Sequence, residues 1–129
     1  MNGWSQANRI GLVMTLLIGA ANVVFALANL PTILDASSAA SAGPPPGVIL
    51  AVGVLGAVML LAAMYAWLKV SRRGATIASV ANILQGMTTL PAFFQAPATW
   101  QVIAGVTLAW TALSVALTLS RSKGSAPVE

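Results

Sequence analysis

The sequence predicts an all-α membrane protein whose four transmembrane helices form an antiparallel, up-and-down bundle. Three observations lead to this prediction. Hydrophobic residues make up 58% of the chain and charged residues only 6%, whereas a soluble domain carries about 25% charged residues. Four apolar runs are long enough to cross a bilayer, which takes about 20 helical residues. All six lysines and arginines border the same side of these runs.

The composition excludes a water-soluble fold. The mean hydropathy is +0.89, and six basic plus two acidic side chains among 129 residues cannot cover a soluble surface. The net charge of +4 would suit a nucleic-acid-binding protein, but the basic residues form three small groups that abut apolar runs. That pattern is typical of membrane orientation. We therefore expect the lipid bilayer as a partner and no nucleic acid.

The predicted spans are residues 10–34, 48–70, 75–94 and 99–119. Lys69 is the only charged residue inside them, and its stem can reach the headgroups from the inner end of the second span. A polar outer loop over residues 35–47 joins the first two spans, and residues 122–129 are expected to be a disordered cytoplasmic tail. Residues 1–121 therefore form a single four-helix transmembrane domain.

The orientation follows from the basic residues, because short loops rich in lysine and arginine stay in the cytoplasm. These residues are Arg9, Lys69, Arg72, Arg73, Arg121 and Lys123. Both termini are therefore predicted to be cytoplasmic. Gly74 is expected to end the second helix and leave a tight inner turn. The abundance of Ala, Val, Gly and Pro is typical of a high-GC bacterium, so we expect the bacterial cytoplasmic (inner) membrane.

The first span has an alternative interpretation. Residues 1–9, followed by an apolar run and by Ala26-Leu27-Ala28, resemble a signal peptide with an A-x-A cleavage site. The apolar run is longer than the roughly 7–15 residues of a signal peptide. The segment also takes part in an internal repeat, which favours a span that belongs to the fold.

The chain contains a repeated helical hairpin. Two pairs of segments match at an offset of 60, residues 21–23 (ANV) with 81–83 (ANI) and 30–31 with 90–91 (both LP). At an offset of 49, residues 68–72 (LKVSR) match 117–121 (LTLSR). We interpret this as a tandem duplication of a two-helix hairpin whose copies have the same membrane orientation. The alternative is chance similarity between apolar segments.

Small and polar side chains form a stripe along three of the spans, at alternating steps of four and three. The stripes are Thr15, Gly19, Asn22, Ala26 and Asn29; Ala75, Ser79, Asn82, Gly86 and Thr89; and Ala104, Thr107, Thr111, Ser114 and Thr118. Such steps keep residues on one helix face. Helices in lipid associate through close backbone approach and interhelical hydrogen bonds, so we expect these faces to meet inside the bundle.

Four polar side chains are predicted to lie near the middle of the bilayer: Asn22, Asn82, Gln85 and Trp110. An unpaired amide in hydrocarbon costs several kcal/mol, so these side chains are expected to meet one another or another buried partner. One interpretation is structural, with hydrogen bonds worth about 0.6 kcal/mol each. The other is a small polar pocket for a solute or a lipid headgroup.

The residues needed for catalysis are missing from the spans. The chain has no His and no Cys, which makes a zinc or haem site implausible. Its only carboxylates, Asp35 and Glu129, lie in an outer loop and at the chain end, where they cannot act as a base beside a buried nucleophile. We therefore predict no catalytic, metal-binding or cofactor-binding residue, no cofactor and no enzymatic activity.

Residues 90–94 (LPAFF) end the third span, and a fourth span follows from Trp100. With this motif the chain resembles uncharacterised small four-span membrane proteins of actinobacteria. The resemblance covers most of the chain and implies the four-span fold, but no activity. Length and span count are also similar to those of the small multidrug resistance transporters. Those transporters rely on a glutamate in the first span, and residues 10–34 contain no acid.

Two functions from different classes agree with these observations. The first is a non-enzymatic scaffold or accessory subunit of a membrane complex, which packs against itself or against other subunits through small-residue helix faces. The second is a small oligomeric carrier, or a lipid- or solute-binding membrane protein, that uses the midplane amides. Replacing Asn22, Asn82 and Gln85 with apolar residues separates them, because only the second function depends on these side chains.

Overall fold

The computed structural model describes residues 3–31, 46–95 and 98–120. These residues form four long helices, α1 (Gln6–Ala28), α3 (Pro46–Lys69), α4 (Arg72–Gln95) and α5 (Ala98–Leu119). The prediction of an all-α fold with four helices is confirmed. Three of the four, α1, α3 and α5, are long and apolar enough to cross a membrane. α4 is less apolar, because serine, threonine, asparagine and glutamine interrupt its sequence.

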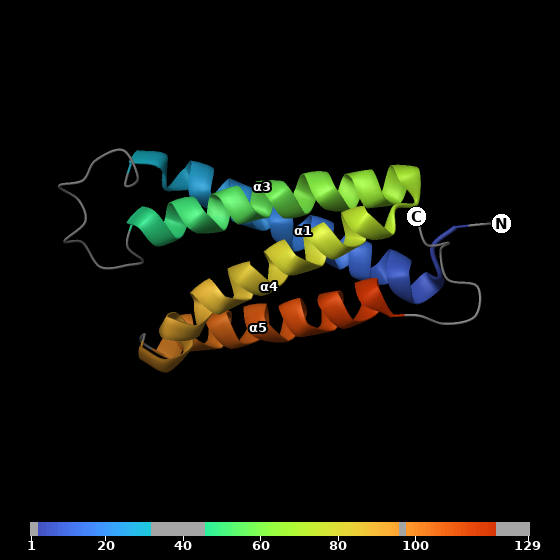
Figure 1. Cartoon of the computed structure of the whole chain (residues 1–129). Coiled ribbons are helices and arrows are strands. Elements are labelled where there is room, and N and C mark those ends of the chain that lie inside the picture. The colour runs from blue at the N-terminus through green and yellow to red at the C-terminus, as the bar shows by residue number, and fades with distance from the viewer. Residues whose placement is uncertain (1–2, 32–45, 96–97, 121–129) are drawn as a thin grey trace.

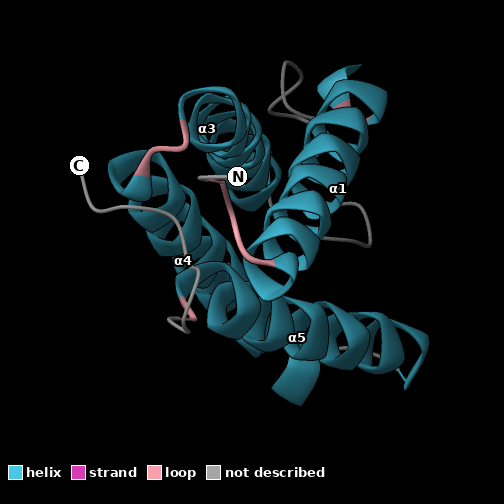
Figure 2. Cartoon of the chain, turned by 90° about the vertical axis from the view of Figure 1, so that its right-hand side faces the viewer, coloured by secondary structure: helices cyan, strands magenta, loops and turns pink. Residues whose placement is uncertain are grey.

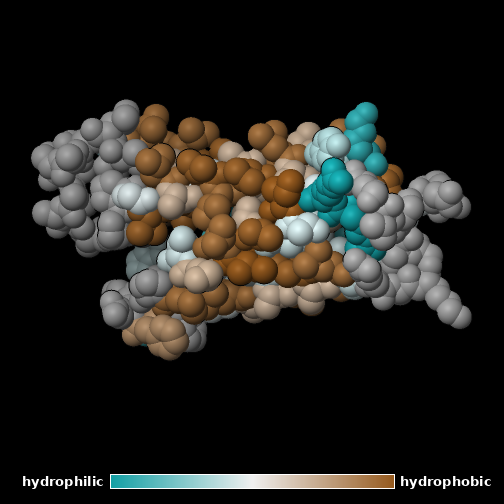
Figure 3. Space-filling view, in the orientation of Figure 1, coloured by the Kyte–Doolittle hydropathy of each residue, from teal (hydrophilic) through white to brown (hydrophobic). Residues whose placement is uncertain are grey.

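The four helices form an antiparallel ring. α1 and α4 each pack against both α3 and α5, while α1 and α4 face each other across the ring with fewer contacts (Figures 1 and 2). The start of α1, the turn between α3 and α4 and the end of α5 lie at one end of the bundle (Figure 1). We call it the basic end. In Figure 3 hydrophilic residues gather there, beside a broad hydrophobic belt.

The distribution of polarity is the reverse of that in a soluble protein. Large apolar side chains cover the outside of all four helices, for example Leu17, Leu61, Ile77 and Val106. Polar side chains are buried between the helices: Asn8, Thr15, Asn22, Ser79, Asn82, Gln85, Thr111, Ser114 and Thr118. In lipid, only neighbouring helices can offer these groups a hydrogen bond. The predicted small and polar stripes thus turn inward.

The turn between α3 and α4 is tighter than the sequence suggested. α3 ends at Lys69, and Val70 adopts a positive φ of 50°. The Ser71 amide then donates to the Ala66 carbonyl oxygen at 3.1 Å, as in a Schellman C-cap. The Oγ of Ser71 accepts from the Gly74 amide at 3.0 Å and so caps the start of α4.

The prediction that Gly74 ends the second helix is wrong, because this residue lies in the first turn of α4. A Cβ atom there would come within 3.0 Å of the Ala62 carbonyl oxygen on α3. Glycine is therefore needed for close approach of the two helices, not for a left-handed turn. The positive φ falls on Val70 instead.

α1 begins four residues before the predicted span, at Gln6, with Ser5 as its N-cap. It ends at Ala28, where the amide of Asn29 bonds back to the last turn. Residues 32–34 of the predicted span, most of the predicted outer loop and the predicted tail lie outside the described residues. The last two positions of that loop, 46 and 47, belong to α3.

Glycines mark where helices touch. Within the α1–α3 hairpin, a Cβ on Gly19 would lie 2.9 Å from the Gly56 carbonyl oxygen. Within the α4–α5 hairpin, a Cβ on Gly86 would lie 3.1 Å from the Thr111 methyl carbon. The hairpins meet closely at the basic end, where Gly11 of α1 lies directly against the backbone of α5. Toward the opposite end they diverge (Figure 1).

Candidate functional site

α4 supplies most of the polar interior. Its side chains Ser79, Asn82 and Gln85 follow one another at steps of three and are 1%, 0% and 2% exposed. The opposite face of the helix is apolar and exposed, with Ile77, Val80, Leu84 and Met87. Three of the residues that lower the hydropathy of α4 are therefore shielded by the other helices. An outer face of this kind suits contact with lipid.

Asn82 links α4 to α5. Its Nδ2 donates to the Oγ of Ser114 at 2.7 Å, and that hydroxyl donates to the Thr111 carbonyl oxygen at 3.0 Å. Both side chains are fully buried. The Oδ1 atom of Asn82 has no hydrogen-bond partner in the described part of the chain. The amide thus satisfies its donor side across the helix interface and leaves its acceptor unpaired.

Gln85 and Asn22 are satisfied less completely. The Nε2 of Gln85 reaches the Thr89 hydroxyl within its own helix at 3.4 Å, which is long, and its Oε1 is unpaired among the described residues. Asn22 is 8% exposed and lies against α3, where a Cβ on Gly56 would come within 2.7 Å of the Asn22 Cβ. Its Nδ2 is likewise unpaired in the described structure.

Trp110 connects α5 to α1. Its Nε1–H donates to the Met14 carbonyl oxygen at 2.9 Å, and the ring is half-buried. Within the described ranges, no hydrogen bond joins any two of the four predicted midplane residues. Asn82 and Trp110 instead each bond to a neighbouring helix, and Asn22 and Gln85 keep unpaired amide atoms inside the bundle.

The chemistry available in this interior is neutral hydrogen bonding. Besides the three amide atoms, the hydroxyls of Ser79, Thr111 and Thr118 are buried without a partner among the described residues. Each unsatisfied group in an apolar medium costs several kcal/mol, so a water molecule or a small neutral solute could lower the energy here. In the same ranges no three His, Cys, Asp or Glu side chains come together as metal ligands would.

Sequence reasoning missed a second polar assembly at the basic end, because Trp4 and Asn8 precede the apolar run of the first span. Trp4 is only 6% exposed, and its Nε1–H donates to the Ala66 carbonyl oxygen at 2.9 Å. The Arg72 guanidinium carbon lies 5.1 Å from the centroid of the Trp4 ring, a cation–π distance. Figure 2 shows the N-terminal segment crossing this end of the bundle.

Asn8 joins the same end to α5. Its Nδ2 lies 3.0 Å from the carbonyl oxygens of Leu117, Thr118 and Ser120, which are among the carbonyls that a helix leaves unpaired at its C-terminus. The side chain is completely buried. The signal that could have revealed it is Ser5 three residues earlier, an N-cap that places the helix start before the apolar run.

Part of the outer surface of α5 is a strip of small residues. Ala109, Ala112 and Ala116 are exposed, and Gly105 on the same face is partly exposed. These four residues follow steps of four, three and four, so they share one face. Large apolar side chains of the same helix, among them Val106 and Leu113, are exposed beside this stripe. The stripe predicted for this span, which includes Thr111 and Ser114, faces inward instead.

The fold and these sites define a small helical-bundle membrane protein with a neutral polar interior. No protein family, no curated protein and no solved structure matches the chain.

Proposed function

We propose that all four helices cross the membrane, with both termini in the cytoplasm of a bacterial cell. The basic end supports this orientation, because Arg9, Lys69, Arg72 and Arg73 all belong to elements that meet there. The apolar outer face of α4 supports a fourth span despite its lower hydropathy. The proposed repeat pairs the α1–α3 hairpin with the α4–α5 hairpin, and the inward stripes of α1 and α4 support it.

Cysteine labelling tests this topology, and the chain has no native cysteine to interfere. We expect Ser120→Cys, at the basic end, to react only from the cytoplasm, and Thr99→Cys, at the start of α5, only from outside. If α4 did not cross, Thr99→Cys would react on the same side as the α3–α4 turn. Labelling of Thr99→Cys from the cytoplasm would contradict four spans.

We further propose that the protein acts without catalysis, as a scaffold or accessory subunit that associates through the outer face of α5. The carrying observation is the exposed stripe Gly105, Ala109, Ala112 and Ala116. Small residues let helices approach closely in lipid, where no hydrophobic force drives them together. Most glycines of α1, α3 and α4 are already used inside the bundle. The small-residue strip of α5 is thus available for a second copy or another subunit.

The test is the oligomeric state in bilayers, measured by energy transfer between labelled copies. We expect association in the native chain and a several-fold weaker one in the Ala109→Leu, Ala112→Leu double variant, because bulky side chains keep the backbones apart. Ala21→Leu, an exposed alanine on α1, is the matched control and should associate normally. Equal effects at both places, or a native chain that stays monomeric and purifies without a partner subunit, would reject the proposal.

The unpaired amide atoms support a second candidate, a carrier or binding protein for a small neutral solute or a lipid headgroup. Such a solute would accept from Asn22 and donate to Asn82 and Gln85. Replacing these with Leu, Leu and Met should leave a scaffold folded and associated. In a carrier, the same change should abolish the rise in melting temperature that a bound solute produces.

A further inference from the structure

A groove between α1 and α3 opens on the apolar surface near the basic end. It encloses about 250 Å³ and is lined by Val13 and Leu16 of α1 and by Met64, Trp67 and Leu68 of α3. Four of these five side chains are exposed, Trp67 to 40% and Leu68 to 74%. The groove therefore faces the surroundings of the bundle and not its core. We call it the α1–α3 groove.

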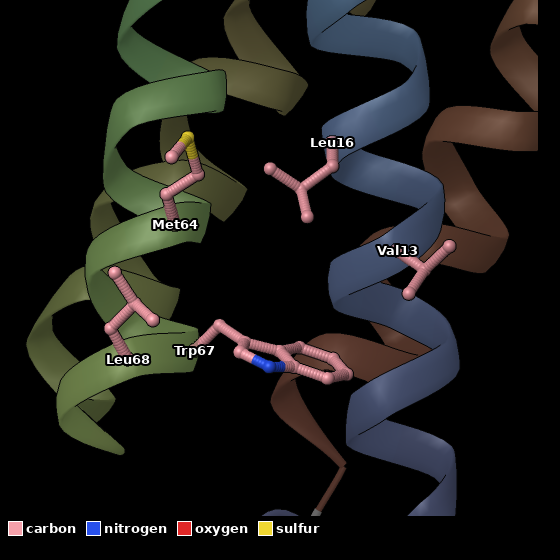
Figure 4. A pocket seen from close by; sticks show the side chains of 5 residues that line it. All are labelled: Val13, Leu16, Met64, Trp67 and Leu68. Carbon is pink, nitrogen blue, oxygen red and sulfur yellow. The ribbon is translucent and has the colours of Figure 1, made fainter.

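Trp67 closes the groove on the side of the basic end. In Figure 4 the indole crosses from α3 toward α1, and its nitrogen lies on the edge that faces away from Met64 and Leu16. No described residue accepts a hydrogen bond from this N–H. Tryptophan at a membrane interface places its apolar ring in the hydrocarbon and its N–H toward the headgroups. A hydrogen-bond donor is thus available where the groove reaches the headgroup level.

Arg9 supplies a positive charge in line with the groove. It precedes Val13 by four residues and Leu16 by seven, so the three share one face of α1, and its side chain is exposed. Lys69 is exposed at the same end but follows Leu68 directly, which turns it onto another face of α3. The Arg9 guanidinium and the Trp67 N–H therefore border the groove, whereas Lys69 lies nearby on another face.

We propose that the α1–α3 groove binds one anionic phospholipid, with an acyl chain against Leu16 and Met64 and the phosphate at Arg9 and the Trp67 N–H. An acyl chain gains little by leaving bulk lipid for these walls, since lipid tails are equally apolar. Selectivity must then come from charge, and one arginine near the membrane surface strengthens binding of an anionic lipid roughly five-fold. This site depends on membrane insertion alone and is independent of association through α5.

Lipid-dependent thermal unfolding in a neutral detergent tests the site. Phosphatidylglycerol should raise the melting temperature more than phosphatidylcholine with the same chains. Arg9→Gln should remove most of that difference, whereas Lys69→Gln makes the same charge change on another face and should keep it. Equal losses in the two variants, equal effects of the two lipids, or a matching rise with inorganic phosphate alone would each overturn the proposal.

A second measurement does not depend on the stability of a charge variant. In the Trp100→Phe background, phosphatidylglycerol brominated on its chains should quench tryptophan fluorescence about twice as strongly as brominated phosphatidylcholine, on the five-fold preference above. Adding Trp67→Phe should abolish the difference. The remaining tryptophans, Trp4 and Trp110, do not line the groove and donate hydrogen bonds within the bundle. Quenching that is equal for both lipids, or unchanged without Trp67, would show that the groove holds no selected lipid.

Discussion

Trp4 and Ser71 donate to the same carbonyl oxygen, that of Ala66, at 2.9 and 3.1 Å. One oxygen thus ties the N-terminal segment to the C-cap of α3 and to the start of α4. The Arg72 guanidinium lies over the Trp4 ring and completes the assembly. The basic end is therefore a connected unit, and its residues should contribute more to stability than their position outside the apolar runs suggests.

Replacing Trp4 tests this unit. Trp4→Ala removes a buried ring and should lower the free energy of unfolding by about 3 kcal/mol, typical of large-to-small changes at buried aromatic positions. Trp4→Phe keeps most of the ring and should cost about 1 kcal/mol for the hydrogen bond. Unfolding by a denaturing detergent measures both. The control is Trp100→Phe, whose ring is exposed, and a Trp4→Ala variant no less stable than this control would disprove the role.

Asn8 is predicted to be sensitive to charge as well as to loss of hydrogen bonds. Asn8→Ala should cost about 2 kcal/mol, because α5 loses its capping donor. Asn8→Asp should cost more, since a carboxylate oxygen would replace the donor and face three carbonyl oxygens at the end of α5. Thermal unfolding at neutral pH measures both variants. An Asn8→Ala variant that is as stable as the native chain would contradict the role of this contact.

Residue spacing predicted the inward faces well but not the helix ends. Steps of four and three placed Asn22, Ser79 and Ser114 on packed faces, because a helix in lipid can bury polar groups only against another helix. The end of α3 could not be predicted, since a valine rarely adopts a positive φ and a nearby glycine offered the expected C-cap. The packing of Gly74 against α3 explains why a glycine stands at this position although it does not end the helix.

The sequence predicted that three of the polar side chains are buried, but not which groups they bond to. Burial of Asn22, Asn82 and Gln85 followed from their depth in apolar runs. Their partners depend on the rotation of each helix, which sequence spacing alone does not fix. For the same reason the spacing did not reveal which of the two small-residue faces of α5 turns outward.

Close helix contact at the basic end predicts a sharp contrast between two glycines. A Cβ on Gly11 would lie 2.8 Å from the Leu117 carbonyl carbon and even closer to the next residue of α5. Gly11→Ala should therefore push α1 and α5 apart and cost about 1–3 kcal/mol, as overpacking does. Gly47→Ala meets nothing within 4 Å and is the matched control. Thermal unfolding that is the same in both variants would contradict this contact.

The strained turn predicts one stabilising substitution. Val70 has φ 50°, a conformation that costs a side-chain-bearing residue roughly 1–2 kcal/mol and glycine very little. Val70 is only partly buried against the core. The strain energy that Val70→Gly relieves should therefore exceed the packing energy that it loses, and the free energy of unfolding should rise by about 1 kcal/mol. Ser71→Ala, one residue later, should instead lower it by about 1 kcal/mol, because the cap of α4 is lost. Opposite shifts in detergent-induced unfolding are the expected result. A loss of stability in Val70→Gly as large as that in Ser71→Ala would show that the turn is held by packing of the valine and not strained by it.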